Sequence, residues 1–562
     1  MCDPPSKRQK AFTKLQLCGR GYGYTQIQQF ANALRHNKTL TTLTIREQYI
    51  SDQEAEALAN ALQHNQTLIT LNLSHNLIIG YGVARLAKAI PRNLTLTALH
   101  LGNNKIGFSE AEHLANSLQY NKTLTTLDLN FNSIGDIGAE YLANALRFNK
   151  TLTTLDISKN GIGNEGAKYL GNALQLNKTL TTLDLSHNDF GHQGAKYLVN
   201  ALQLNKTLTT FNLGSDSIGD TEVKYLANVL QQNNTLTTLH LQSNYIYDEG
   251  AEYLANALQQ NKTLAIFSLN TTAISVQGAE YLSNALQQNK TLTTLNFRWN
   301  EMGAEGAKHL ANALLYNKTL TTLNLSHNEI GDHGAEYLAD ALQHNTALTT
   351  LDLSYNKIDD RGAEYLGNTL QHNKTLITLH LQRNVIGDQG GEYLANALQQ
   401  NKTLTILNLG SNHIGDHGAE HLGKALELNK TLVILNLSSN RIGDEGAKQF
   451  GNALVHNKIL TTLSLSGKEI SAQGAQYLAN ALIHNNTLTT LTFQWNRIGA
   501  QGAQYFANSL QYNETLTALD LSYSEIGDQG AEYLANALQH NKVISSSTFY
   551  LTELLMHYFH RY

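Results

Sequence analysis

Apolar and polar residues recur along most of the chain with a strict period of 28. Residues 180–207 read "LTTLDLSHNDFGHQGAKYLVNALQLNKT", and closely similar segments begin at Leu208, Leu236 and Leu264. With this first leucine as position 1, nineteen units fit into residues 12–543 without an insertion. A unit of this length can bury its apolar face only against its neighbours, so the period predicts a stack of repeats.

Each unit predicts one strand and one helix. Apolar residues at positions 1, 4 and 6, as in residues 180–185, alternate like a half-buried strand. Apolar residues at positions 16, 19, 20 and 23 form the stripe of an amphipathic helix, as at Ala335, Leu338, Ala339 and Leu342. Position 9 is asparagine in thirteen of the nineteen units, where a buried amide can satisfy backbone groups leaving the strand. Aspartate at position 13 can cap a helix start.

These residues resemble the leucine-rich repeat, L-x-x-L-x-L-x-x-N-x-I, and the 28-residue unit is similar to its ribonuclease-inhibitor-like subclass. The resemblance implies an α/β fold: a right-handed solenoid, or horseshoe, with a parallel sheet on the concave face and helices on the convex face. The family includes nuclease inhibitors, the sensor regions of NOD-like receptors and the Ran GTPase-activating protein, so it specifies the fold more closely than the function.

The pattern divides the chain into a polar tail at residues 1–11, the solenoid at 12–543 and a degenerate C-terminal cap at 544–562. Leu551, Leu554, Leu555 and Tyr558 share one helical face and can seal the last unit. Six units replace the position-9 asparagine, among them those with Lys468 and Ser524, and we expect local irregularity there.

The net charge, the apolar runs and the cysteine count indicate which partners and which cellular compartment to expect. The formal net charge is −5, with no polybasic stripe, which disfavours nucleic acid. The sequence contains no run of about 18 apolar residues, the length that a membrane-spanning helix needs, so we predict no membrane span. The two cysteines are too few for a disulfide framework, so we expect a cytoplasmic protein. Asn-x-Thr recurs in register, as at Asn177, and reads either as the turn chemistry of the repeat or as a glycosylation acceptor.

No residue set predicts catalysis, a metal site or a cofactor. His64, His344 and His372 all fall at position 25, in the return loop, without cysteine or carboxylate at ligand spacing. The segment "CGRGYG" at residues 18–23 lacks the form of a phosphate-binding loop. We therefore expect a protein that is not an enzyme.

The residues that vary between units predict the working surface. Variation concentrates at positions 5, 7 and 8, which we expect to face the hollow of the sheet. Aromatic residues and arginine, the types enriched at binding hot spots, gather there. The predicted protein-binding residues at positions 7 and 8 are Phe131, Arg298, Trp299, Tyr355, Arg383, Trp495 and Tyr523. Stacked rings that merely pack on one another are the alternative.

Position 5 carries Asp128, Asp156 and Asp184 in consecutive units, which predicts three carboxylates about 5 Å apart. Such a ladder either binds a basic partner or is simply solvated. Together these features predict a protein-interaction scaffold that holds a protein partner, of unknown identity, on its concave face. The alternative is a regulator of an enzyme, of the small-GTPase-activating or nuclease-inhibitor type, that acts through binding.

Overall fold

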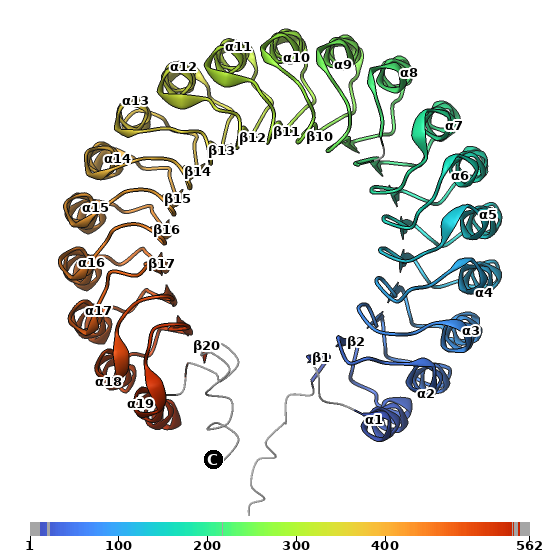
Figure 1. Ribbon diagram of the computed structural model, residues 1–562, viewed down its shortest axis with the longest axis horizontal. Coiled ribbons are helices and arrows are strands. Elements are labelled where there is room, and N and C mark those ends of the chain that lie inside the picture. Colours follow the sequence, from blue (N-terminus) through green and yellow to red (C-terminus); the bar gives the residue numbers. More distant parts are fainter. Residues whose placement is uncertain (1–11, 20–22, 216, 542, 544–548, 551–562) are drawn as a thin grey trace, which may run out of the picture. The chain divides into compact units, whose positions relative to one another are not determined.

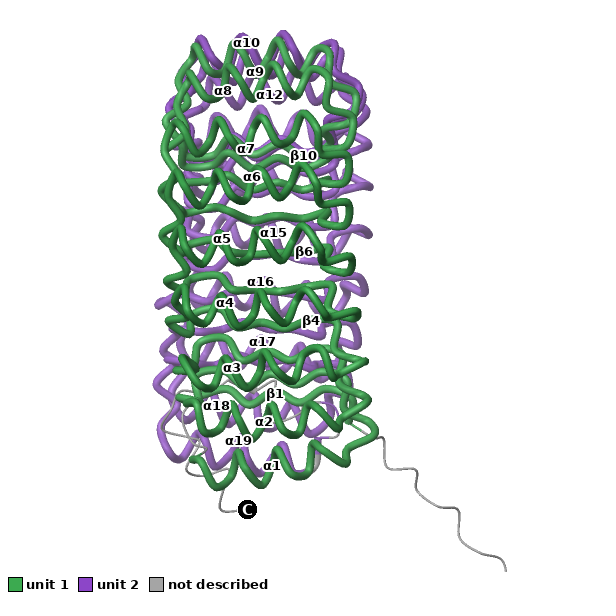
Figure 2. Tube along the Cα trace, turned by 90° about the vertical axis from the view of Figure 1, so that its right-hand side faces the viewer, with its two compact units in different colours: residues 1–272 green, residues 273–562 purple. Residues whose placement is uncertain are grey.

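The structure is a computed structural model that describes residues 12–19, 23–215, 217–541, 543 and 549–550, drawn in colour in Figure 1. The chain divides into two compact units, residues 1–272 and 273–562, coloured green and purple in Figure 2. The predicted tail at residues 1–11 lies outside the described residues, as do the predicted cap residues Leu551, Leu554, Leu555 and Tyr558. The division into tail, solenoid and cap stays a prediction.

Unit 1 alternates strands and helices in the predicted order. Its strands are β1 (Lys14–Cys18), β2 (Thr42–Arg46), β3 (Thr70–Asn72), β4 (Ala98–His100), β5 (Thr126–Asp128), β6 (Thr154–Asp156), β7 (Thr182–Asp184), β8 (Thr210–Asn212), β9 (Thr238–His240) and β10 (Ile266–Ser268). Its helices are α1 (Tyr24–His36), α2 (Asp52–Leu62), α3 (Gly80–Ala89), the 3₁₀ helix η1 (Ile90–Arg92), α4 (Phe108–Leu118), α5 (Gly135–Leu146), α6 (Asn164–Leu176), α7 (Gly191–Leu204), α8 (Asp220–Leu230) and α9 (Asp248–Gln260).

Unit 2 repeats the same alternation. Its helices are α10 (Val276–Gln288), α11 (Gly303–Tyr316), α12 (Gly331–His344), α13 (Asp360–Leu370), α14 (Asp388–Gln400), α15 (Asp416–Leu428), α16 (Asp444–His456), α17 (Ala472–His484), α18 (Gly499–Leu510) and α19 (Gly527–His540). Its strands are β11 (Thr294–Asn296), β12 (Thr322–Asn324), β13 (Thr350–Asp352), β14 (Thr378–His380), β15 (Ile406–Asn408), β16 (Ile434–Asn436), β17 (Thr462–Ser464), β18 (Thr490–Thr492), β19 (Ala518–Asp520) and β20 (Phe549–Tyr550).

Within each unit the strands pair in parallel and in the register of the repeat. Leu127 of β5 lies opposite Leu155 of β6, and Leu323 of β12 lies opposite Leu351 of β13, each 28 residues further along the chain. In each unit the strands line one side and the helices the other (Figure 1). This confirms the predicted α/β solenoid with a parallel sheet.

The predicted apolar positions form the core between these two layers. Leu323 and Leu325 from the strand segment, and Ala335 and Leu338 from the facing helix α12, are buried. Burying each such leucine contributes about 2 kcal/mol. Neighbouring strands lie about 4.8 Å apart, whereas packed helices lie about 8 to 10 Å apart. Each of the two compact units therefore curves, with its strands on the inside.

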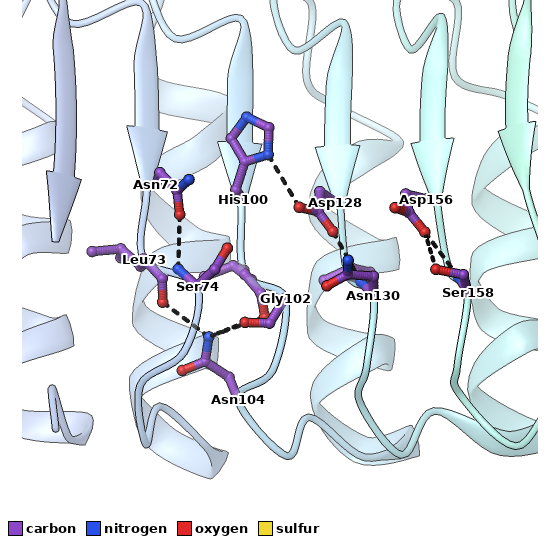
Figure 3. Close-up of polar contacts among 12 residues, drawn as sticks. Asn72, Leu73, Ser74, His100, Gly102, Asn104, Asp128, Asn130, Asp156 and Ser158 are labelled. Atoms are coloured by element: carbon purple, nitrogen blue, oxygen red, sulfur yellow. Dashed lines mark hydrogen bonds and ion pairs between the residues drawn. The ribbon is translucent and has the colours of Figure 1, made fainter. Parts of the chain in front are cut away.

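Two asparagine ladders join consecutive repeats. At position 9, the Asn104 side-chain amide donates to the Leu73 carbonyl of the preceding repeat at 3.0 Å and to the Gly102 carbonyl of its own at 3.3 Å (Figure 3). At position 26, Asn177 donates to the Leu146 carbonyl, one repeat earlier, at 2.7 Å. The position-9 asparagine therefore has the predicted role, and the return-loop asparagine has a similar one.

The position-13 aspartates cap helix starts, as predicted, but each one caps the helix of the following repeat and not the helix of its own repeat. Asp388, in the first turn of α14, accepts hydrogen bonds from the backbone N–H groups of Gly415 and Gly418, at 2.7 and 2.8 Å. Gly415 is the N-cap residue of α15. Each such carboxylate therefore stabilises the neighbouring helix start as well as the stack.

The repeat that contains Lys468 departs from the common loop, as predicted. Its position-8 residue, Gly467, does not have the positive φ found at this position in other repeats, and Lys468 is exposed. The substitution at Ser524 is milder, because its hydroxyl donates to the Phe493 carbonyl at 3.1 Å in place of the amide. None of the helices in the described ranges has the length and apolar character needed to cross a bilayer.

Candidate protein-binding surface

Position 8, in the loop that follows the strand, has a left-handed backbone in most repeats. The predicted binding residues at this position have φ between 53° and 59°: Phe131, Trp299, Tyr355, Arg383, Trp495 and Tyr523. A bulky residue rarely adopts this conformation, which costs of order 1 kcal/mol or more. The side chains therefore extend from the loop at the strand exit, whereas position 5 is the last residue of the strand itself.

In unit 2, four consecutive position-8 side chains form one continuous series of contacts, which we call the aromatic ladder: Trp299, His327, Tyr355 and Arg383. The Trp299 and His327 ring centroids are 4.7 Å apart with the rings tilted by 59°. His327 and Tyr355 stack at 3.7 Å and 20°. The Arg383 guanidinium lies 5.1 Å from the Tyr355 ring centroid. Three predicted residues are thus brought together, with His327 between them.

An arginine stands at each end of this ladder. Arg298, at position 7, places its guanidinium 5.8 Å from the Trp299 ring centroid. Burial lowers the pKa of His327, and the positive charges of Arg298 and Arg383 lower it further, against the opposing effect of Asp352. Because its pKa is lowered, the His327 imidazole is neutral at pH 7, which suits a ring stacked on Tyr355 and in contact with Trp299.

A cavity of about 680 Å³ opens beside the ladder. The ladder forms one part of its lining, and the position-10 residues of the same repeats form another: Glu301, Glu329, Lys357 and Val385. Lys357 and Glu329 are paired at 2.7 Å. The cavity therefore combines exposed aromatic area with a few separated charges, which is typical of a recognition site.

The other predicted aromatic residues form separate, smaller groups. In unit 2, Trp495 and Tyr523 stack at 4.1 Å with their planes within 7°. In unit 1, the Lys159 ammonium lies 4.6 Å from the Phe131 ring centroid. Within unit 2, the ladder is the longer of the two series.

The predicted acidic ladder is present in unit 1. Asp128, Asp156 and Asp184 lie side by side in the register of β5, β6 and β7. Each carboxylate accepts a hydrogen bond from the backbone N–H two residues later, as Asp156 does from Ser158 at 2.9 Å and Asp128 does from Asn130 at 3.0 Å (Figure 3). These aspartates therefore have a structural role in the strand-exit turn that the sequence analysis did not recognise.

Polar neighbours extend the acidic ladder at both ends. His100 Nδ1 lies 3.2 Å from Asp128 Oδ2, and Asn212 donates to Asp184 Oδ2 at 2.8 Å. In the described part of the chain, Asp156, in the middle, has no such hydrogen-bonded partner in a neighbouring repeat. Burial raises its pKa to about 6, against the hydrogen bonds from Ser158, and the charges of Asp184 and Asp128 raise it further. Among the described residues, no group of three or more histidine, cysteine, aspartate or glutamate side chains could hold a metal ion.

Sequence reasoning missed His327 and the position-10 charges. His327 is 28 residues from both Trp299 and Tyr355, so the period alone could have placed it between them. The position-10 residues carried no signal, because the sequence does not show that their loop lies beside the ladder.

Two family models match the chain. The TMOD/LMOD Leucine-rich domain matches residues 21–135. The Leucine Rich repeat matches residues 148–171, 176–199, 232–255, 288–311, 316–339, 344–367, 372–395, 400–423, 428–451, 484–507 and 512–535. A search of curated proteins finds no match to the sequence.

Among solved structures, the chain is similar to the mouse RP105/MD-1 complex, with 15% identity, a TM-score of 0.49, and coverage of 90% of this chain and 91% of the other. The TLR13–ssRNA13 complex has 18% identity, a TM-score of 0.48, and coverage of 90% and 83%. Leiomodin-1 Actin-Binding Site 2 has 27% identity, a TM-score of 0.22, and coverage of 24% and 78%.

The family matches together cover more than half of the residues, and they agree with the period, the asparagine ladder and the parallel strands described above. The chain therefore belongs to the leucine-rich repeat family.

Proposed function

We propose that this protein is a non-enzymatic, cytoplasmic interaction scaffold that binds a protein partner on the strand-exit surface of unit 2. The single observation that carries this proposal is the aromatic ladder, which lines a cavity of about 680 Å³ and has exposed residues, Trp299 and Arg383, at its two ends. The 28-residue unit with a full helix supports placing the chain in the ribonuclease-inhibitor-like subclass.

The ladder has the energetic features of a binding hot spot. Trp299 is 53% exposed, although a tryptophan side chain loses much favourable burial when it is left in water. Its ring contacts His327 at a centroid distance of 4.7 Å, and this contact restricts the Trp299 side chain before a partner binds, which lowers the entropic cost of binding. A half-exposed tryptophan on a left-handed backbone lowers the stability of the free protein, and a partner that buries the ring would offset this cost.

The acidic ladder of unit 1 gives weaker support for binding. Each of its carboxylates already accepts a backbone hydrogen bond in its own turn, as Asp156 does from Ser158. Asparagine takes the same role in other repeats, as Asn324 does for Ser326 at 2.9 Å. We therefore place the main contact in unit 2, and keep Asp128, Asp156 and Asp184 as a secondary prediction.

The proposal is tested by affinity capture with three proteins: the wild type, a ladder variant (Trp299→Ala with Tyr355→Ala) and a matched control (Tyr316→Ala with Tyr512→Ala). The control residues are exposed aromatic side chains of the same unit, near the C-terminal ends of α11 and α18. Circular dichroism first establishes that all three are folded.

A protein retained by the wild type and by the control, but lost by the ladder variant, is the expected result. Equal retention by all three would refute the placement of the site. A captured enzyme whose rate changes on addition of the wild type would favour the alternative, a regulator that acts through binding.

A further inference from the structure

Both faces of the Tyr355 ring and one face of the His327 ring are already covered within the protein, whereas Trp299 is tilted by 59° against His327 and is 53% exposed. His327 lies between Trp299 and Tyr355, and the outer face of Tyr355 is covered by the Arg383 guanidinium. At His327 and Tyr355, a bound group therefore meets ring edges rather than open ring faces. Aromatic edges carry partial positive charge, so they favour apolar contact and anionic groups over another stacked ring.

The positive charges of Arg298 and Arg383, at the two ends of the ladder, are not neutralised by an ion pair among the described residues. Each guanidinium lies over a ring of the ladder. In contrast, Lys357 of the same surface is neutralised by Glu329 at 2.7 Å. Guanidinium groups recognise carboxylates through paired hydrogen bonds, so both ends of the ladder suit an acidic side chain.

The repeat fixes the distance between these ends. Trp299 and Arg383 are three repeats apart in sequence, and neighbouring strands lie about 4.8 Å apart, so the ladder spans about 14 Å. An extended chain rises about 3.3 Å per residue, and therefore covers this distance in about four residues. A single segment running along the strand exits can reach both arginines.

A nucleic-acid strand fits this surface less well. Single-stranded nucleic acid binds through bases stacked on open aromatic faces and through a continuous basic track. Here the Tyr355 ring is covered by His327 and Arg383, and the cavity is also lined by Glu301 and Glu329. Two separated arginines match the sparse charges of a peptide.

We infer that the partner contributes an extended acidic segment with two carboxylate side chains about four residues apart and an apolar side chain between them. The carboxylates pair with Arg298 and Arg383, and the apolar side chain enters the cavity against the edges of His327 and Tyr355. This inference rests on the proposed function and names the chemistry of its partner.

Glu301 provides a way to distinguish an acidic occupant of the cavity from a basic one. Its carboxylate is exposed, lines the cavity and has no ion pair among the described residues. An acidic segment would be repelled by it, so Glu301→Gln strengthens binding if the occupant is acidic and weakens it if the occupant is basic.

The test uses a library of random peptides displayed on phage, selected on the full chain and counter-selected on the Arg298→Ala, Arg383→Ala double variant. Selected sequences are then synthesised with glutamate or aspartate replaced by the corresponding amide. Binding is followed by the fluorescence of Trp299 in a Trp495→Phe background, because these are the only two tryptophans of the chain.

We expect selected peptides with two acidic residues three to five positions apart. Their amide versions should bind about tenfold more weakly, since two exposed charge pairs are lost. Arg298→Ala and Arg383→Ala should remove that difference, Glu301→Gln should tighten binding, and Arg361→Ala, an exposed arginine of α13, should change nothing.

Peptides without an acidic pair, amide versions of equal affinity, or the absence of any peptide that depends on the two arginines would overturn the inference. Competition by a single-stranded oligonucleotide at lower concentration than the peptide would overturn it as well. If a captured partner is lost with Trp299→Ala and Tyr355→Ala but is unaffected by the arginine variants, the proposed function stands and this inference fails.

Discussion

The side-chain amide of Asn356 holds the backbone of Asn328, its counterpart in the preceding repeat. Asn356 Oδ1 accepts a hydrogen bond from the Asn328 backbone N–H at 2.9 Å and another from Ile330 at 3.3 Å. Its Nδ2 donates to the Leu325 carbonyl at 2.9 Å. Asn356 is fully buried, so no water replaces these bonds.

Asn356→Ala should therefore reduce the free energy of unfolding by about 3 kcal/mol, because buried backbone groups lose their partners. Asn356→Ser should cost about half as much, since Ser524 shows that a hydroxyl at this position can still bond the preceding repeat. Urea denaturation gives the overall loss, and hydrogen exchange at the Asn328 and Ile330 amides localises it. Equal losses for the two variants would contradict the role of the amide.

Asp388→Ala should weaken the start of α15 rather than that of its own helix. The Asp388 carboxylate accepts two backbone hydrogen bonds from the α15 start, and losing such a cap costs about 1 kcal/mol. Asp528→Ala is the matched control, because Asp528 occupies the same position and is exposed, with no hydrogen-bonded partner among the described residues. Hydrogen exchange should be faster at Gly415 and Gly418 in Asp388→Ala alone.

Asp156→Asn should stabilise the protein above pH 7. Burial raises the Asp156 pKa from 3.8 to about 6, so the folded state holds this proton more tightly than the unfolded state does. The stability that this group contributes is fully present below pH 3.8 and is lost as the pH rises through about 6. The gain on neutralising it is at most about 3 kcal/mol.

The asparagine keeps the turn intact, since Asn324 accepts the same hydrogen bonds from Ser326. Thermal unfolding of both proteins between pH 3.5 and 8 checks the prediction: the curves should converge at the acidic end and separate at pH 8. A larger gain at the acidic end would contradict the sign.

Asn177 should not accept an N-linked glycan in the folded chain. Its Nδ2 donates to the Leu146 carbonyl at 2.7 Å, its Oδ1 accepts from the Leu180 N–H at 2.7 Å, and the residue is 2% exposed. The experiment offers an oligosaccharyltransferase and its lipid-linked donor to the folded chain and to the urea-unfolded chain. Mass spectrometry should find Asn177 modified only after unfolding, and equal modification of both would show that the return loop opens readily.

The sequence by itself determined which residues become neighbours. With a period of 28 and no insertions, residues one repeat apart must lie at equivalent places on adjacent strands, as Leu323 and Leu351 do. The strand, the helix, the position-9 asparagine and the adjacency of Trp299, Tyr355 and Arg383 within a few repeats all follow from that one regularity.

Only the tertiary structure decided where the side chains point and which partners they take. Trp299, His327 and Tyr355 all have a left-handed backbone in the loop, and His327 lies between the other two rings, stacked on Tyr355 and tilted against Trp299. The Asp156 carboxylate bonds its own turn, and Asp388 bonds the next helix instead of its own. The physical reason is that a repeat fixes spacing along the stack, whereas side-chain direction depends on backbone angles and on competition among nearby hydrogen-bond donors, which the period does not record.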